Sequence, residues 1–229
     1  MKVLAIESST HRGQIALADG EKTLAVRSLT KNAEELTLSV DEALKETSIG
    51  KSDIGLVAVS SGPGFFTSLK VGAAAAKAFA YALGIPIAPV PSLELLAASA
   101  DCRQGNICAA IDARSGMFFR AFFRKENGVL SRMSEDEVVS AGELARGAAE
   151  MKDDGLTAVL QEGSGARRGD DGAGIEGFAV TSSSAAVCAA LGLRLMEEGK
   201  TETAFSFSPK YLRKDLYEPA PGGLTPPPS

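Results

Sequence analysis

The chain has 229 residues, of which 45% are hydrophobic and 23% are charged, with a formal net charge of −5. This composition is typical of a folded globular protein and excludes a disordered chain. The acidic balance indicates no basic stripe of the kind that grips nucleic acid. If the protein serves RNA, we expect it to do so through a partner.

We expect neither a targeting signal nor a membrane span in this chain. No segment approaches the roughly 18 uninterrupted apolar residues of a membrane span, and the start MKVLAIESST reaches Glu7 too early to supply a signal-peptide core. We therefore expect a cytoplasmic protein that makes no membrane contact. Cys102, Cys108 and Cys188 form no Cys-x-x-Cys pair, which predicts buried free thiols in a reducing compartment.

The first half of the chain alternates strands and helices. KVLAIES predicts a strand that ends at Glu7, and GQIALADGEKTLAVRSL predicts a hairpin with its turn at Asp19–Gly20. A helix is expected over residues 33–47, then a buried strand, GLVAVS, then a helix over residues 67–83 that ends at Gly84. Four apolar residues recur on one face of the first helix: Leu36, Val40, Ala43 and Leu44.

The second half repeats this order. NICAAIDA predicts a strand ending at Asp112, and MFFRAFFR with GVLSR predicts a hairpin around Asn127–Gly128. A helix is expected from Ser140, because Ser140 and Glu143 have the spacing of a capping box. LTAVLQ, a glycine-rich loop, FAVT and a helix over about residues 183–198 complete the pattern.

The duplicated βββαβα order predicts two similar α/β domains, each with a mixed sheet that carries helices. We expect one domain over residues 1–100, a second over residues 101–216, and a disordered Pro/Gly-rich tail over residues 217–229. Two domains of this kind usually frame a cleft. Glu7 and Asp112 end the first strand of each half, so they are candidate cleft residues.

The segment SSGPGFFTSLKVG, at Ser60–Gly72, resembles a phosphate-binding turn but lacks the spacing of one. Thr67 stands where a dinucleotide fingerprint has its third glycine, and no Gly-Lys pair precedes a Ser or Thr. A strand-to-helix turn capped by Thr67 explains the segment as well. In the helix that follows, Gly72, Ala76 and Ala80 form a small-residue ridge. This ridge could admit another protein's helix or pack on the chain's own sheet.

Four stretches together resemble the TsaB (YeaZ) family within the actin-like ATPase superfamily: LAIESS, SGPGFFTSLKVG, IDARSGMFFRAFF and SPKYLR. The resemblance runs from Lys2 to about Arg213. It implies two actin-like (RNase H-like) domains and a role in the machinery that installs threonylcarbamoyl on tRNA. In that family the protein is not the catalyst. It docks a TsaD-like catalytic subunit and works with a TsaE-like ATPase, it forms a homodimer in isolation, and tRNA is contacted only indirectly.

The same resemblance implies that the first two helices carry the partner interface. The residues it assigns there are Leu36, Val40, Ala43, Leu44, Phe66, Thr67, Lys70, Val71, Gly72, Ala75, Ala76, Phe79 and Ala80. The family usually has Asp at the position of Glu7, Ser at Phe65, Gly at Ser68 and Arg at Lys70. These four departures put any ligand carried over to the turn in doubt.

The sequence contains few of the residue patterns that catalytic sites use. The single histidine, His11, excludes a metal site built on two histidines one helical turn apart. We expect no catalytic residue, no metal and no required cofactor, with Glu7, Asp112 and Arg114 as a possible nucleotide cleft. ATP with Mg²⁺ is expected only at a complex interface. The alternative is a small ATP-dependent phosphotransferase that uses Glu7 and Asp112 with Mg²⁺, and a nuclease ranks last because only these two carboxylates are placed.

Overall fold

The computed structural model describes residues 1–10, 12–29, 32–151, 156–161 and 177–213, and for residues 32–34 the backbone alone. His11, nearly all of the glycine-rich loop and the predicted tail therefore lie outside the described residues. None of the described helices combines the length and the hydropathy needed to cross a membrane. All three cysteines are buried free thiols, as predicted.

The first half of the chain forms a five-stranded mixed sheet in the order β3-β2-β1-β4-β5. β1 pairs antiparallel with β2 and parallel with β4, so the hairpin lies at one edge and the parallel strands at the other. The elements of this half are β1 (Lys2–Glu7), β2 (Gln14–Asp19), β3 (Lys22–Ser28), α1 (Asn32–Thr47), η1 (Lys51–Asp53), β4 (Ile54–Ser60), α2 (Phe66–Leu83), β5 (Ile87–Val90) and α3 (Ser92–Ser99).

The second half forms a sheet in the equivalent order, β8-β7-β6-β10-β11, with β9 added beside β7. Its central strand β6 again pairs antiparallel with the following hairpin strand and parallel with β10. This repeated order confirms the prediction of two similar α/β units. The elements are β6 (Gly105–Asp112), β7 (Met117–Glu126), β8 (Val129–Arg132), β9 (Glu137–Ser140), α4 (Ala141–Glu150), β10 (Leu156–Gln161), β11 (Ala179–Thr181) and α5 (Ala185–Glu197).

Local sequence signals account for most element ends. The Ser140 side chain accepts a hydrogen bond from the Glu143 N–H and the Glu143 carboxylate accepts one from the Ser140 N–H, which is the predicted capping box of α4. α2 ends at Gly84 in the left-handed conformation, also as predicted. Its start differs from the prediction. Phe65 occupies the N-cap position without a side-chain bond, and Thr67 lies inside the helix.

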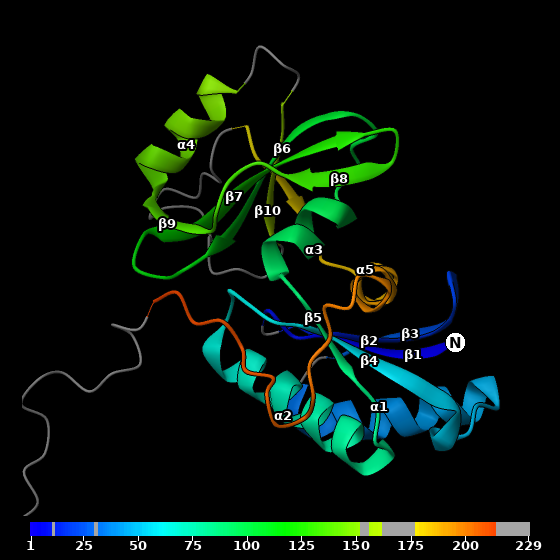
Figure 1. The fold of residues 1–229 in the computed structure, drawn as a ribbon. Coiled ribbons are helices and arrows are strands. Elements are labelled where there is room, and N and C mark those ends of the chain that lie inside the picture. The colour runs from blue at the N-terminus through cyan, green and yellow to red at the C-terminus, as the bar shows by residue number, and fades with distance from the viewer. Residues whose placement is uncertain (11, 30–31, 152–155, 162–176, 214–229) are drawn as a thin grey trace, which may run out of the picture.

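Each sheet is covered on both faces. α1 and α2 pack on one face of the first sheet and α5 packs on the other (Figure 1). The face under α1 and α2 is built from large side chains such as Leu4, Ile6 and Val59, whereas the face under α5 is built largely from alanines, including Ala5 and Ala58. Small residues let α5 lie close: a side chain at Gly192 of α5 would strike the methyl group of Ala58.

The last helix of each half packs against the sheet of the other half. α3 follows the first sheet in the chain but packs against β6 and β7, while α5 follows the second sheet and packs against β1, β2, β4 and β5. The prediction of two contiguous domains, 1–100 and 101–216, does not match this packing, because burying the apolar faces of α3 and α5 requires the other half. The sequence pattern also missed β5, α3 and β9.

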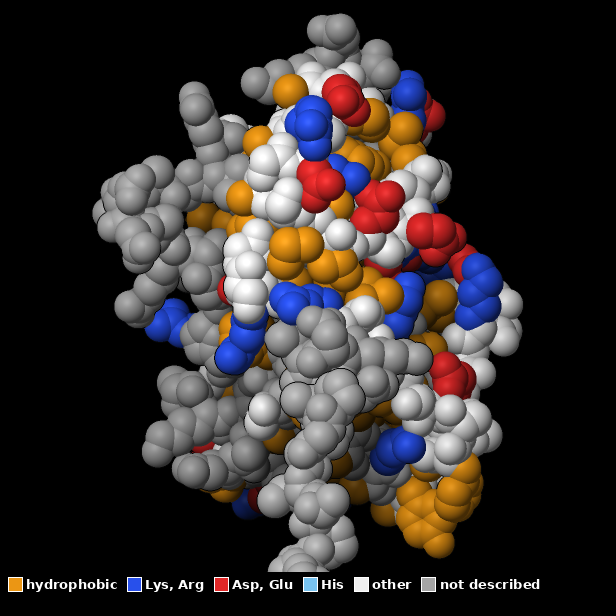
Figure 2. All heavy atoms as spheres, turned by 90° about the vertical axis from the view of Figure 1, so that its left-hand side faces the viewer, with side chains coloured by type: hydrophobic (Ala, Val, Ile, Leu, Met, Phe, Trp, Pro, Cys, Tyr) orange, Lys and Arg blue, Asp and Glu red, His pale blue; other side chains and the backbone are white. Residues whose placement is uncertain are grey.

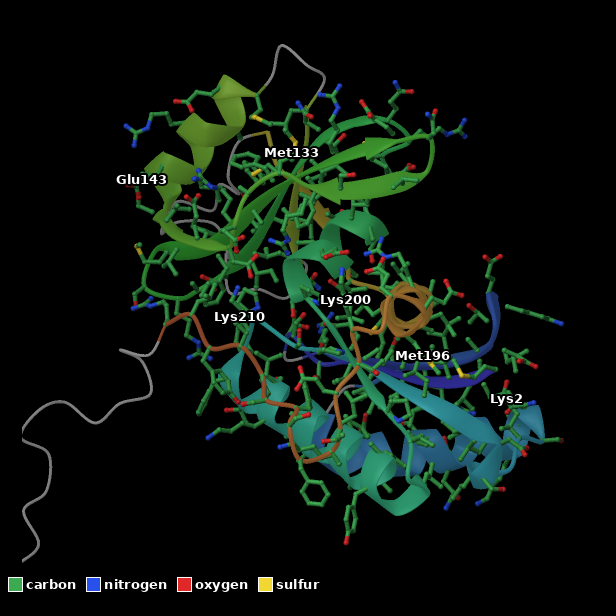
Figure 3. All side chains as sticks on the ribbon, in the orientation of Figure 1. Lys2, Met133, Glu143, Met196, Lys200 and Lys210 are labelled. Atoms are coloured by element: carbon green, nitrogen blue, oxygen red, sulfur yellow. The ribbon has the colours of Figure 1, made fainter. Side chains whose placement is uncertain are left out.

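A final segment ties the two halves together, and we call residues 202–213 the strap. Glu202 bridges to Ile87 at the edge of the first sheet, and Phe207 is fully buried in the core beneath α1 and α2. The backbone N–H of Lys210 donates to Ser61 at 2.7 Å, while its ammonium group pairs with Asp136 of the second half at 2.9 Å. Figure 3 shows Lys210 between the two halves. The strap therefore fixes their relative position.

Candidate functional site

The end of β1 holds a carboxyl group in the protein interior. The Glu7 side chain accepts hydrogen bonds from the backbone N–H and the hydroxyl of Ser9, and the residue is only 1% exposed. Burial raises the pKa of the Glu7 carboxyl from its ordinary value of 4.5 to about 7, and the hydrogen bonds from Ser9 offset part of this effect. Cys188 of α5 lies beside it, and burial raises the pKa of that thiol well above its ordinary value.

The turn that begins α2 closes over the end of β1. The Phe65 N–H donates to the Ser9 carbonyl at 2.8 Å, and a side chain at Gly64 would strike the same carbonyl. Further along, within α2, a side chain at Gly72 would strike the hydroxyl of Ser8. These glycines therefore serve close packing, since Gly64 lies against the Ser9 backbone and Gly72 against the Ser8 side chain. This packing favours a strand-to-helix turn over a phosphate-binding turn.

A cleft of about 410 Å³ lies between the two halves of the fold. It is lined by the start of α2 on one side and by the end of β6 on the other: Gly64, Phe65, Phe66, Thr67, Asp112, Ala113, Arg114 and Phe119. Asp112 and Arg114 are thus brought together as predicted. Glu7, also predicted for the cleft, is not part of this lining, because it is 1% exposed and lies beside Cys188 of α5. A magnesium site shared by Glu7 and Asp112 does not fit a carboxyl group that is buried and bonded to Ser9.

The β6–β7 turn carries Arg114 in a constrained conformation. Arg114 and Ser115 have positive φ angles of 64° and 55°, which is uncommon for residues with side chains. The Asp112 carboxylate accepts the Arg114 N–H at 2.8 Å, and the Arg213 guanidinium of the strap donates to the carbonyls of Ala113 and Arg114 at 2.9 and 3.0 Å. These bonds hold the turn at the mouth of the cleft.

The helix α2 has one buried and one exposed face, and this division corrects part of the predicted interface. Seven of the thirteen residues assigned to a partner are buried in the chain's own core, so they cannot be surface contacts: Leu36, Val40, Ala43, Leu44, Gly72, Ala76 and Ala80. The ridge Gly72–Ala76–Ala80 packs inward. Of the other six, Thr67 and Lys70 are exposed, and Phe66, Val71, Ala75 and Phe79 are half-buried.

A second small-residue ridge, which the sequence analysis missed, lies on the outer face of α2. Ala74, Ala78 and Ala82 are all exposed and recur every four residues. Beside them Tyr81, 69% exposed, meets Phe205 of the strap, 82% exposed, in an edge-to-face pair with ring centroids 5.6 Å apart. We call Ala74, Ala78, Tyr81, Ala82 and Phe205 the docking face. Only the observed orientation of α2 distinguishes this ridge from the buried one.

Comparisons with known proteins give the family. A family model described as "TsaD: tRNA N6-adenosine threonylcarbamoyltransferase" matches residues 28–167, more than half of the chain. The "tRNA threonylcarbamoyladenosine biosynthesis protein TsaB" of Bacillus subtilis (strain 168) is 32% identical over 142 residues, 61% of this chain and 62% of that protein. The TsaB protein of Haemophilus influenzae is 36% identical over 121 residues, half of each chain. The matched region thus spans about three fifths and one half of these relatives.

The fold has a solved counterpart. The structure of "YeaZ from Pseudomonas aeruginosa" superposes with a TM-score of 0.74 at 21% identity, covering 92% of this chain and 99% of that one. A two-unit actin-like (RNase H-like) fold is therefore shared over nearly the whole chain. The family-model match, over more than half of the chain, shows that the chain belongs to the family that the TsaD model describes.

Proposed function

We propose that this chain is a non-catalytic assembly subunit of the machinery that makes threonylcarbamoyladenosine in tRNA. Its relatives at 32 and 36% identity are both named for threonylcarbamoyladenosine biosynthesis. With one histidine in the whole sequence, the chain cannot build the histidine pair of a metal-dependent transferase. The buried Glu7 also leaves one wall of the cleft without the exposed carboxylate that a phosphotransferase would use.

The observation that carries the proposal is the docking face. Large exposed aromatic side chains beside small ones are typical of a protein–protein interface, because the aromatics bury area and the alanines let another helix approach. An exposed ridge of alanines permits helix axes to come within about 8–10 Å. The occupant we propose is a TsaD-like catalytic subunit, since the TsaD family model itself matches α1 and α2 of this chain and so predicts a partner with a similar pair of helices.

The same face serves a homodimer when the partner is absent. Two copies can place the same ridge against each other around a twofold axis, so homodimer and heterodimer compete for one surface. A TsaE-like ATPase is the third component that the family resemblance implies. ATP with Mg²⁺ would bind at an interface of the assembled complex and not within this chain alone.

The test is a substitution on the docking face with a matched control. Ala78→Arg places a long charged side chain on the outer ridge, and Ala149→Arg places the same side chain on the exposed face of α4, in the other half of the fold. Size-exclusion chromatography with light scattering is run on each protein alone and mixed with the TsaD-like protein of the same organism. Circular dichroism confirms that both variants are folded.

We expect the unmodified chain and Ala149→Arg to form a one-to-one complex, and Ala78→Arg to lose at least about 100-fold in affinity, because an unpaired charge would be buried at a helix contact. Ala78→Arg should also be monomeric alone. The proposal is wrong if the unmodified chain and the TsaD-like protein elute separately. If Ala78→Arg binds as tightly as Ala149→Arg, the docking face is not the interface.

A further inference from the structure

Two lysines, Lys70 and Lys77, border the docking face and are the charged residues of α2. They lie seven residues apart, which is about two turns of helix, so both lie on one side of α2 with about 10 Å between them along its axis. Ala74 lies between them on that side, and Ala78 follows Lys77. Figure 2 shows apolar side chains projecting from the lower end of the molecule, where α1 and α2 lie, with a Lys or Arg side chain beside them.

The chain itself supplies no counter-charge to these two lysines. Among the described residues, no carboxylate forms an ion pair with either of them, and the Lys70 ammonium lies instead 3.8 Å from the ring centroid of Phe66, one helical turn earlier. Lys70 is exposed and Lys77 is half-buried, so another protein can reach both. Because α2 contains no acidic residue, its outer face is positively charged although the net charge of the chain is −5.

The neighbouring helix α1 differs, because its acidic side chains are paired with cations of the same chain. Asp41 forms an ion pair with Lys45 at 2.7 Å. Arg27 of β3 pairs with Glu42 at 3.3 Å and with Glu46 at 2.8 Å. A second copy of the chain would therefore bring to this contact carboxylates that already have partners.

This distribution of charge separates the two occupants of the docking face. In a twofold homodimer each α2 faces the other, so two Lys70 and two Lys77 side chains enter one contact, and like charges repel. A different subunit can place carboxylates against the same lysines and form charge-assisted hydrogen bonds with them. The charge of the docking face therefore favours an acidic helix surface over a second copy of this chain.

We propose that Lys70 and Lys77 select the partner by charge: they pair with carboxylates two helical turns apart on the TsaD-like subunit, and they weaken the homodimer. This inference rests on the proposed function, because it takes the docking face as the interface. Salt then acts on the two complexes in opposite directions. It screens the attraction in the heterodimer and the repulsion in the homodimer, so the heterodimer weakens while the homodimer strengthens.

The experiment measures two dissociation constants of the full chain, by analytical ultracentrifugation for the homodimer and by calorimetry for the complex with the TsaD-like protein of the same organism. Both are measured at about 0.1 M and about 1 M sodium chloride, over which the Debye length falls from about 10 Å to about 3 Å. The test variant is Lys70→Gln with Lys77→Gln. The control, Lys22→Gln with Lys125→Gln, removes the same charge at the start of β3 and near the end of β7.

At low salt we expect the test variant to bind the TsaD-like protein about tenfold more weakly than the unmodified chain does, and to form homodimers about tenfold more tightly. Its two dissociation constants should also change less with salt. The control should stay within about twofold of the unmodified chain for both complexes. The opposite directions are informative, because a defect in the folding or packing of α2 would weaken both complexes together.

A mixture of two forms of this chain tests the repulsion without the TsaD-like protein. The variant Lys70→Glu with Lys77→Glu carries carboxylates where the unmodified chain carries ammonium groups. We expect these two forms to associate with each other at least about tenfold more tightly than either associates with itself.

Three results would overturn the proposal. The first is a change of both complexes in the same direction in the test variant, the second is an equal effect of the test and control variants, and the third is a mixture whose two forms show no preference for each other. The docking face survives any of these results if Ala78→Arg still prevents binding. Failure of the proposed function looks different, because the unmodified chain and the TsaD-like protein would then form no complex at either salt concentration, which would overturn both proposals.

Discussion

Replacing Glu7 with Gln should remove the part of the pH dependence of folding stability that comes from the Glu7 carboxyl group. The Glu7 carboxyl is buried at the end of β1, where its pKa is raised to about 7 by burial. Gln has the shape of the protonated side chain, and its oxygen can still accept the hydrogen bonds from Ser9. The variant therefore keeps the packing but cannot ionise.

The sign of the effect follows from proton binding. Between pH 4.5 and about 7 the folded chain keeps a proton on Glu7 that the unfolded chain has released. The free energy of unfolding therefore falls as pH rises through this window, and Glu7 adds no further pH dependence above it. At about 1.4 kcal/mol for each pH unit, the whole window corresponds to about 3 kcal/mol. Between pH 5 and pH 8 we expect a loss of about 2 to 3 kcal/mol.

Urea unfolding followed by circular dichroism at pH 5 and pH 8 measures this loss for both proteins. Other groups that titrate in this range contribute to both proteins and cancel in the comparison. We expect the stability of the unmodified chain to fall by about 2 to 3 kcal/mol more than that of Glu7→Gln, with Glu7→Gln the more stable protein at pH 8. Parallel pH profiles would refute the reasoning, because they would mean that Glu7 ionises in the fold as it does in the unfolded chain.

Two further predictions concern the strap and the cap of α4. Phe207→Ala should lower the free energy of unfolding by about 3–5 kcal/mol, measured in urea, because it removes a fully buried ring under α1 and α2. A loss below about 1 kcal/mol would mean that the strap is not part of the core. Ser140→Ala should cost about 1 kcal/mol in urea unfolding through loss of the hydrogen bond from the Glu143 N–H, and it should leave assembly through the docking face unchanged.

Local signals made most of the elements predictable from the sequence. Asp19–Gly20 and Asn127–Gly128 mark hairpin turns because few residues adopt positive φ, and Gly20, Asn127 and Gly128 do so in the structure. Ser140 with Glu143 marks the start of α4 for a similarly local reason. The repeated order of strands then follows from chain order alone, which is why the fold class was predictable.

Tertiary packing decided what the sequence left open. The inner and outer ridges of α2, Gly72–Ala76–Ala80 and Ala74–Ala78–Ala82, are both runs of small residues at the same spacing. The local sequence does not indicate which ridge packs on the sheet. In the structure it is the inner ridge, whose Gly72 packs against Ser8. The exchange of α3 and α5 between sheets was likewise unpredictable, because each helix could cover either sheet. The cleft depends on this long-range arrangement as well.

The two halves use one position of the duplicated fold differently, and the difference bears on function. Glu7 and Asp112 each end a central strand and each accept the N–H of the residue two positions later. Two such carboxylates facing one cleft could share a metal-bound phosphate. Here Glu7 is 1% exposed and lies beside Cys188 of α5, whereas Asp112 lines the cleft. The two halves therefore do not present a matched pair of carboxylates to the cleft, and a metal-bound phosphate shared between them does not fit this arrangement.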